Sequence, residues 1–158
     1  DPCQGRAMKL LFVCMGNICR SPTVAAVARV EFARAGLDIE VDSAGTEGYH
    51  IGHAADPRSI ALAAAHGYPM RAHRARQLCA ADFSRFDHLL VMDHANLRAA
   101  LAKAPADAGD RVALFLPFVG ISEPAELPDP YYGGASDFGR ALDLARDGIM
   151  ALIRGRLR

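Results

Sequence analysis

Apolar residues divide the chain into short strand-like runs and longer helical stretches. Residues 9–13 and 88–92 are almost wholly apolar, as expected of strands that are buried on both faces. Residues 38–42 alternate between polar and apolar side chains, and residues 111–116 form a further apolar run. These segments predict four β-strands.

Apolar residues at helical spacing predict helices between and after these strands. Proline at the first turn and glycine just beyond the end support two of them: Asp56-Pro57 opens one, and Gly36 and Gly67 close the first and second. The predicted helices span residues 22–35, 56–65, 96–103 and 136–156. Segments 43–49 and 120–134 read as loops. Strands that alternate with helices indicate an α/β fold with a parallel sheet and right-handed crossovers.

Length and charge narrow the class of protein. A chain of 158 residues fits one domain, expected at 8–158, with residues 1–7 as an artificial remnant or a disordered arm before Met8. Lys+Arg and Asp+Glu both number 18, so no overall field favours nucleic acid or an anionic membrane, and neither is expected as a partner. No apolar run approaches the ~20 residues of a membrane span.

The number of cysteines and the N-terminal sequence indicate the cellular compartment of the protein. The four cysteines (Cys3, Cys14, Cys19 and Cys79) read as reduced thiols, because a chain of this size needs no disulfides for stability. The N-terminus has no signal-peptide core. A cytoplasmic protein is therefore expected, and export by a specialised route stays open.

The strongest chemical signal is Cys14, followed six residues later by Arg20, between a buried strand and a helix. Gly16 and Asn17 tolerate a left-handed turn, and Ser21 with Pro22 suits a helix start. Such a loop turns backbone N–H groups inward as an anion-binding nest at a helix N-terminus. The dipole and Arg20 both favour a thiolate. The motif predicts a cysteine-dependent phosphatase, whereas a lone cysteine at a strand end is more often a small buried side chain.

Other residues could complete such a site. Asp129 lies between two prolines and is the best candidate for a general acid, although aspartate is common in turns. The adjacent Tyr131 and Tyr132 suggest a binding rim. No His, Cys, Asp or Glu set has metal-ligand spacing, so neither a metal nor another cofactor is expected. The basic run 71–76 reads as a solvated face.

In several separated segments the chain resembles the low molecular weight protein tyrosine phosphatases. The resemblance covers nearly the whole chain from Met8 and keeps the segments in order. The matching segments are 12–22, 41–46, 48–52, 66–67, 75–77, 82–83, 86–87, 92–93, 96–97, 129–133 and 136–138. It implies a three-layer α/β sandwich whose four-stranded parallel sheet has the order 2-1-3-4, with the phosphate-binding loop after strand 1.

The resemblance also implies the roles of the site residues. Cys14 would be the nucleophile that forms a phosphocysteine, Arg20 the phosphate clamp and Asp129 the general acid and then base. Phosphate would be bound by the backbone amides of Met15, Gly16, Asn17, Ile18, Cys19 and Arg20. Asn17 would hold its left-handed turn with support from Ser43 and His66, and Ser21 would hydrogen-bond the Cys14 thiolate. Tyr49 and Tyr131, with Met15 and Ile18, would wall a slot for an aromatic phosphate ester, and Tyr132 would lie at its rim.

Substrates and competing functions follow from the same resemblance. The expected partners are phosphotyrosine proteins, among them a bacterial tyrosine kinase or host proteins, with inorganic phosphate as a product inhibitor. A thioredoxin-coupled arsenate reductase would need two further cysteines, and beyond the loop only Cys79 is available. In protein arginine phosphatases the position of Ile18 resembles threonine, and Ile18 suits a phenyl ring better. A non-enzymatic phosphate- or redox-sensing module is a further alternative.

Cys19 suggests redox control. It lies five residues after Cys14 in one curled loop, so the two sulfurs could approach bonding distance with a modest backbone movement. A reactive Cys14 would form a sulfenic acid that Cys19 resolves as a disulfide. The alternative is that Cys19 only packs the loop.

Overall fold

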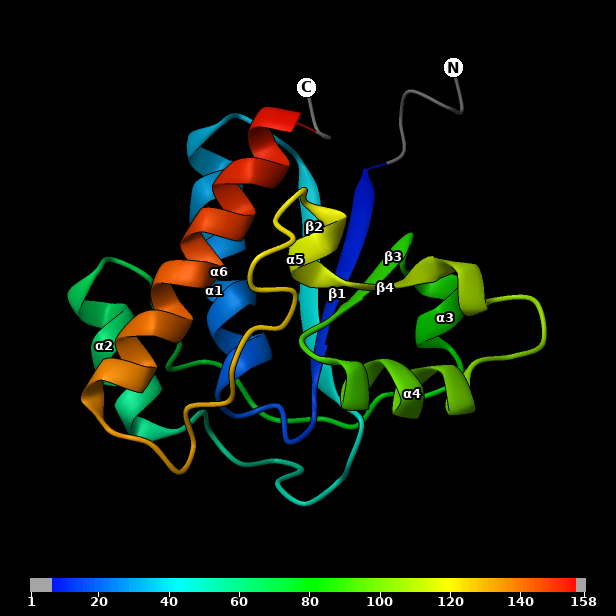
Figure 1. Ribbon diagram of the computed structural model, residues 1–158, viewed down its shortest axis with the longest axis horizontal. Helices are drawn as coiled ribbons and strands as arrows, with labels where there is room; N and C mark the ends of the chain where they lie inside the picture. The colour runs from blue at the N-terminus through cyan, green and yellow to red at the C-terminus, as the bar shows by residue number, and fades with distance from the viewer. Residues whose placement is uncertain (1–6, 156–158) are drawn as a thin grey trace.

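Four parallel strands form one sheet in the order β2-β1-β3-β4 in the computed structural model, which describes residues 7–155 (Figure 1). The central strand, β1, pairs with β2 on one side and β3 on the other, so that Leu10 lies opposite both Val41 and His88. The strands are β1 (Met8–Cys14), β2 (Ile39–Gly45), β3 (His88–Val91) and β4 (Val112–Leu114). The predicted fold class and strand order are confirmed.

Helices cover both faces of this sheet. The structure contains α1 (Arg20–Arg34), α2 (Pro57–Ala65), α3 (Asp82–Arg85), α4 (His94–Lys103), the 3₁₀ turn η1 (Gly109–Arg111), α5 (Phe115–Phe118) and α6 (Ala135–Gly155). In Figure 1 α1 and α6 lie on one side of the strands, and α3 and α4 lie on the other. The result is the predicted three-layer sandwich.

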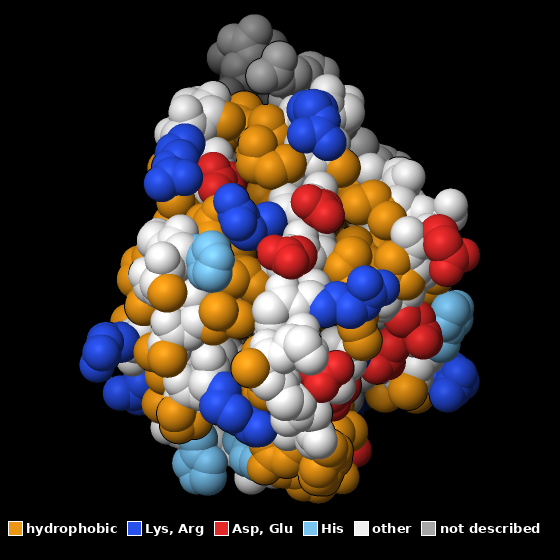
Figure 2. Space-filling model, turned by 60° about the vertical axis from the view of Figure 1, so that its left-hand side comes forward, with side chains coloured by type: hydrophobic (Ala, Val, Ile, Leu, Met, Phe, Trp, Pro, Cys, Tyr) orange, Lys and Arg blue, Asp and Glu red, His pale blue; other side chains and the backbone are white. Residues whose placement is uncertain are grey.

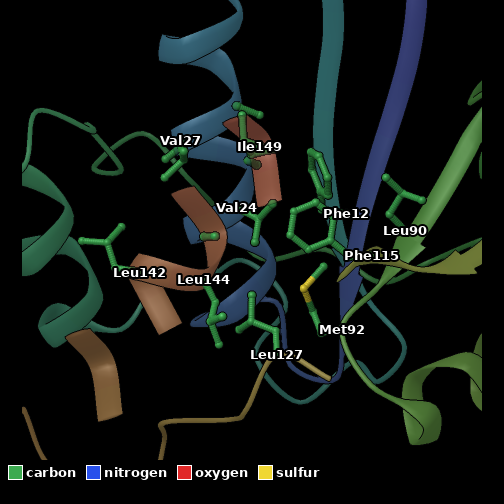
Figure 3. Packing of buried hydrophobic residues seen from close by; sticks show 14 of the residues in the cluster. Phe12, Val24, Val27, Leu90, Met92, Phe115, Leu127, Leu142, Leu144 and Ile149 are labelled. Carbon is green, nitrogen blue, oxygen red and sulfur yellow. The ribbon is translucent and has the colours of Figure 1, made fainter. Parts of the chain in front are cut away.

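A hydrophobic core lies on each face of the sheet, and alternate residues of the strands point into one or the other. Leu10 and Phe12 of β1 face the core under α1 and α6, whereas Leu11 and Val13 face the one under α3 and α4. Figure 3 shows the first core, where the Phe12 ring meets the Phe115 ring edge-on with their centroids 5.6 Å apart. Helices bury both faces of the central strands, which explains why β1 and β3 carry apolar side chains on successive residues.

Local sequence signals fix the helix ends close to where they were expected. Asp56 caps α2 by accepting the Arg58 N–H at 2.9 Å, with Pro57 in the first turn. Gly36 and Gly67 follow α1 and α2 with φ of 73° and 88°, the left-handed conformation that ends a helix.

Some boundaries and two short helices differ from the sequence prediction. The predicted loop 43–49 begins later, because β2 runs on to Gly45, which pairs with Cys14 and bridges to Gln77. The predicted strand 111–116 shortens to β4 and turns into α5 at Phe115, whose ring packs against Phe12. The short helices α3 and α5 were not predicted. The prediction for residues 1–7 falls, except at Ala7, outside the described residues.

Candidate active site

The loop between β1 and α1 surrounds a cavity of about 310 Å³ at the carboxyl end of the sheet. Cys14 ends the central strand and is 3% exposed. Asn17 has φ of 60°, the left-handed turn that the sequence predicted. Met15, Gly16, Ile18 and Cys19 line the same cavity, as do Cys14, Asn17 and Arg20. The arrangement is a loop wrapped around a sulfur atom at the start of a helix.

Hydrogen bonds fix Cys14 and Asn17 in one network. The Cys14 Sγ lies 2.9 Å from Ser21 Oγ and 3.3 Å from the Asn17 backbone N–H that donates to it. The buried Asn17 side chain donates to Ser21 Oγ at 2.9 Å and to Ser43 Oγ at 3.0 Å, and its Oδ1 accepts the Arg76 N–H at 3.0 Å. The Asn17 side chain is therefore bonded to α1 through Ser21, to β2 through Ser43 and to the backbone at Arg76, and these bonds stabilise the turn of the loop.

Arg20 lies at the base of the cavity, where its side chain is only 5% exposed. Its Nη1 donates to Asp93 Oδ2 at 2.7 Å and to the Leu127 carbonyl at 3.1 Å. Burial lowers the pKa of Arg20, but Cys14, Asp93 and Asp129 outweigh burial and raise it. Arg20 is therefore a fixed cation beside the Cys14 sulfur.

Asp93 is a residue that sequence reasoning missed. Its Oδ1 accepts the Asn96 N–H at 2.7 Å and so caps α4, while Oδ2 binds Arg20. The cap signal, an aspartate just before a helix, was present in the sequence, but the partner of the second oxygen lies 73 residues away. Only the fold reveals that partner.

Asp129 lies at the mouth of the cavity, with its side chain 39% exposed. Its Oδ2 is 3.7 Å from Arg20 Nη2, and its Oδ1 accepts the Tyr131 N–H at 3.1 Å. The loop that carries Asp129 thus brings a carboxyl group to the Nη2 side of Arg20, although nothing in the local sequence fixes that approach.

Arg58, in the first turn of α2, holds the loop that carries Asp129. Its guanidinium donates twice to Asp56, at 3.0 and 2.8 Å, and once to the Tyr131 carbonyl at 3.1 Å. It also lies over the Phe138 ring, 4.4 Å from the centroid. The Asp56 N–H in turn donates to Ile18 O at 2.8 Å. Arg58 therefore joins the Cys14 loop side of the cavity to the Asp129 side.

Exposed aromatic side chains surround the cavity mouth. Tyr49 is 68% exposed and Tyr132 is 94% exposed, and both line the cavity with Tyr131 and His50. The Tyr131 and Tyr132 rings meet edge-on, 4.9 Å between centroids. Figure 2 shows hydrophobic side chains gathered at the lower end of the molecule, where Figure 1 places the loops after β1 and β2. Apolar surface of this kind marks a binding rim.

The prediction for His66 is wrong. His66 is exposed, and its Nδ1 lies 3.0 Å from the Leu62 carbonyl, one turn back in α2, because it caps the end of that helix. The histidine that supports the phosphate loop is His73, whose Nε2 is 2.7 Å from the Asn17 carbonyl oxygen. Burial lowers the pKa of His73. The neutral ring therefore donates from Nε2.

Cys19 is buried beside Cys14 in the loop, whereas Cys79 is exposed and lies outside the cavity. Burial, together with the Asp56 carboxylate, raises the pKa of Cys19 to about 12. Cys19 is therefore a protonated thiol at neutral pH.

Within residues 7–155, no group of three or more His, Cys, Asp or Glu side chains is arranged to hold a metal ion. No helix in that part of the chain is long and apolar enough to cross a membrane.

Comparisons with known proteins agree on one family. The family model for low molecular weight phosphotyrosine protein phosphatases matches residues 9–157. The chain is 43% identical over 157 residues to a low molecular weight protein-tyrosine-phosphatase of Streptomyces coelicolor, covering 92% of this chain and 93% of the relative. It is 42% identical over 134 residues to the human low molecular weight phosphotyrosine protein phosphatase, covering 82% and 83%.

Solved structures give the same answer. A protein tyrosine phosphatase from Entamoeba histolytica superposes with a TM-score of 0.90 at 36% identity, covering 96% of this chain and 97% of that one. Vibrio vulnificus Wzb, solved in complex with benzylphosphonate, superposes with a TM-score of 0.83 at 31% identity, covering 94% and 99%. The chain belongs to the low molecular weight protein tyrosine phosphatases.

Proposed function

We propose that this enzyme hydrolyses phosphotyrosine and other aryl phosphates through a phosphocysteine on Cys14. The observation that carries the proposal is the convergence of the Cys14 sulfur, the buried Arg20 guanidinium and the Asp129 carboxyl group on one cavity. A nucleophile, a cation and an acid within one small cavity are the groups that phosphoryl transfer needs in the absence of a base-activated hydroxyl.

In the first step the Cys14 thiolate attacks phosphorus. The S–P bond forms as the bond from phosphorus to the ester oxygen breaks. The Asn17 N–H and Ser21 Oγ, which contact Sγ, keep the thiolate in place. Arg20 is held at Nη1 by Asp93, so its other N–H groups remain for two phosphoryl oxygens, a geometry that lysine could not match.

Asp129 supplies and then recovers a proton. Protonated Asp129 gives its proton to the leaving oxygen in the first step. In the second step its carboxylate takes a proton from water, whose oxygen attacks phosphorus while the S–P bond breaks. Free phosphate and the Cys14 thiolate result. General acid–base catalysis of this kind typically contributes about 10²–10⁴-fold.

The walls of the cavity favour an aromatic ester. Tyr49, Tyr131, Met15 and Ile18 line it, and Tyr132 lies at its edge. A flat phenyl ring fits between such side chains. The benzylphosphonate complex of the Vibrio vulnificus relative supports an aryl ligand in this family.

Physiological substrates are proposed by class. Phosphotyrosine proteins, including a bacterial tyrosine kinase or host proteins, fit the slot, and inorganic phosphate would bind the same loop as a product inhibitor. A cytoplasmic location remains a prediction of the sequence.

Side-by-side assays separate this function from its alternatives. Para-nitrophenyl phosphate and a phosphotyrosine peptide should be hydrolysed, and chelators should not reduce the rate. Cys14→Ser and Arg20→Ala should abolish turnover, and Arg20→Lys should remove most of it. Faster turnover of phosphoarginine, or arsenate reduction that depends on Cys79, would favour the alternatives. Binding without turnover would favour a sensing module.

We further propose that Cys19 protects the nucleophile. Peroxide would oxidise the Cys14 thiolate to a sulfenic acid and be reduced to water. The protonated Cys19 thiol would then attack the sulfenic acid sulfur: an S–S bond forms, the S–O bond breaks, and the Cys19 proton leaves with the hydroxyl group as a second water. After peroxide and then thiol, wild type and Cys79→Ser should recover activity, but Cys19→Ser should not. Equal recovery in all three proteins would leave Cys19 as packing only.

A further inference from the structure

A second cavity, of about 610 Å³, opens between α1, α2 and the loop of residues 69–74. It is larger than the catalytic cavity and shares no lining residue with it. Nothing in the proposed reaction uses it. Its volume is in the range of sites that bind small organic molecules.

The cavity concentrates positive charge in a chain whose formal net charge is zero. Arg29 of α1 lines it with Arg71 and Arg74 of the loop. The one acidic lining residue, Asp42, is already paired with Arg76 at 3.2 Å and lies 3.9 Å from Arg29. Arg74 Nη1 donates to the backbone carbonyls of Arg71 and His73, at 3.1 and 2.7 Å. Within residues 7–155 neither Arg71 nor Arg74 forms an ion pair, so no carboxylate neutralises their charge. One guanidinium group can donate two parallel hydrogen bonds to two oxygens of a phosphate.

The rest of the lining is aliphatic. Ala26, Ile60, Ala64, Pro69 and Met70 contribute walls, and no phenylalanine, tyrosine or tryptophan lines the cavity. Among the described lining residues the only aromatic ring is the His73 imidazole, so the walls offer little for a nucleobase or a phenyl group to stack on. The cavity suits an aliphatic body instead, because burial of apolar surface is favourable.

His73 connects this cavity to the catalytic loop. Its ring lines the second cavity, and its Nε2 donates to the carbonyl of Asn17, whose own N–H donates to the Cys14 sulfur. The charged groups that act on His73 come from every side: Arg29 from α1, Asp42 from β2 and Arg74 from its own loop. An anion beside the arginines would add negative charge next to this ring.

We infer that the second cavity binds a phosphomonoester with an aliphatic body, and that its occupation acts on the phosphate loop through His73. The phosphate group would lie among Arg29, Arg71 and Arg74, and the chain along Ile60 and Ala64. Binding in this cavity does not require the proposed reaction at Cys14, so the binding test and the test of the proposed function can fail separately.

Octylphosphonate is a suitable probe because it cannot be hydrolysed. Amide resonances followed by NMR report the two cavities separately, with residues 70–74 for the second cavity and 15–20 for the catalytic one. Octylphosphonate should shift the 70–74 amides, and inorganic phosphate saturating the catalytic loop should not prevent it. The double variant Arg71→Gln/Arg74→Gln should weaken this binding at least about tenfold. The matched control Arg98→Gln/Arg140→Gln, which removes two exposed arginines elsewhere, should bind like wild type.

A second variant tests the site without removing its arginines. Ala64→Glu places a carboxylate at an exposed lining position and should abolish binding by occupying the arginines. Octylphosphonate should also raise the measured pKa of the His73 imidazole, because the added anion favours the protonated ring. Shifts confined to residues 15–20, equal affinity in the arginine double variant, equally tight binding of inorganic phosphate at 70–74, or an unchanged His73 titration would each overturn the inference.

Discussion

Asp93 should orient the Arg20 guanidinium, which we propose as the phosphate clamp. One of its oxygens holds Arg20 at 2.7 Å, and the other caps α4 at 2.7 Å through the Asn96 N–H. Two substitutions separate these roles. Asp93→Asn keeps a good N-cap but removes the charge, whereas Asp93→Ala removes both.

The structure sets the expected magnitudes. The Arg20 side chain is 5% exposed and that of Asp93 is 22% exposed, so their hydrogen bond is largely shielded from water. A hydrogen bond to a charged group contributes about 1.5–3 kcal/mol, which corresponds to a loss of about 13- to 160-fold in kcat/KM if all of it serves to orient the fork. The Leu127 carbonyl still holds Arg20 at 3.1 Å, so some activity should remain. Loss of the cap costs a further 0.5–2 kcal/mol, roughly, in the free energy of unfolding.

Two measurements check these figures. Steady-state hydrolysis of para-nitrophenyl phosphate should show similar losses of kcat/KM in both variants, because both lose the charge on the Arg20 partner. In urea unfolding, the free energy of unfolding of Asp93→Ala should be lower than that of Asp93→Asn by the contribution of the helix N-cap. Wild-type kcat/KM in Asp93→Asn would refute the orienting role, and equal unfolding free energies would refute the cap.

Three further changes have defined outcomes. Arg58→Ala should release the Asp129 loop and lower kcat for poor leaving groups more than for good ones, and a uniform loss across a leaving-group series would contradict this. The two hydrogen bonds from the Arg76 guanidinium outweigh burial and lower the pKa of Asp82 below its usual 3.8. The ion pair therefore stabilises the folded protein fully above pH 3.8, and this contribution is lost as the pH falls through the folded-state pKa. Acid unfolding of Asp82→Asn should therefore lack that part of the pH dependence. The Cys19 thiol, with its pKa near 12, should resist iodoacetamide at about pH 8 until the protein is unfolded, which mass spectrometry can follow, and rapid alkylation in the folded protein would contradict its burial.

The sequence was sufficient for features whose signals are local. The glycine and asparagine of the Cys14 loop tolerate a left-handed turn, and the structure has one at Asn17. Asp56 with Pro57 marked the start of α2 by chemistry within three residues. The order of the sheet came from family resemblance, because alternation alone predicts a parallel sheet without fixing which strands are neighbours.

Features that depend on distant contacts could not be read this way. His66 and His73 stand seven residues apart near one loop, and only the path of the backbone decides that His73 reaches Asn17 while His66 turns to its own helix. The apolar run 111–116 fits a strand or a helical turn equally well, and Phe115 packs against Phe12 in the helical one. Tertiary packing decides such cases.

Rapid-quench analysis of the phosphoenzyme tests the central claim most directly. The enzyme is mixed with para-nitrophenyl phosphate and quenched within milliseconds, and its peptides are mapped by mass spectrometry. Asp129→Asn serves to slow the second step, since the good leaving group needs little protonation but water still needs a base. We predict a burst of nitrophenol and a phosphate on Cys14, more abundant in Asp129→Asn and absent in Cys14→Ser. Turnover without phosphate on Cys14, or phosphate on another residue, would contradict the mechanism.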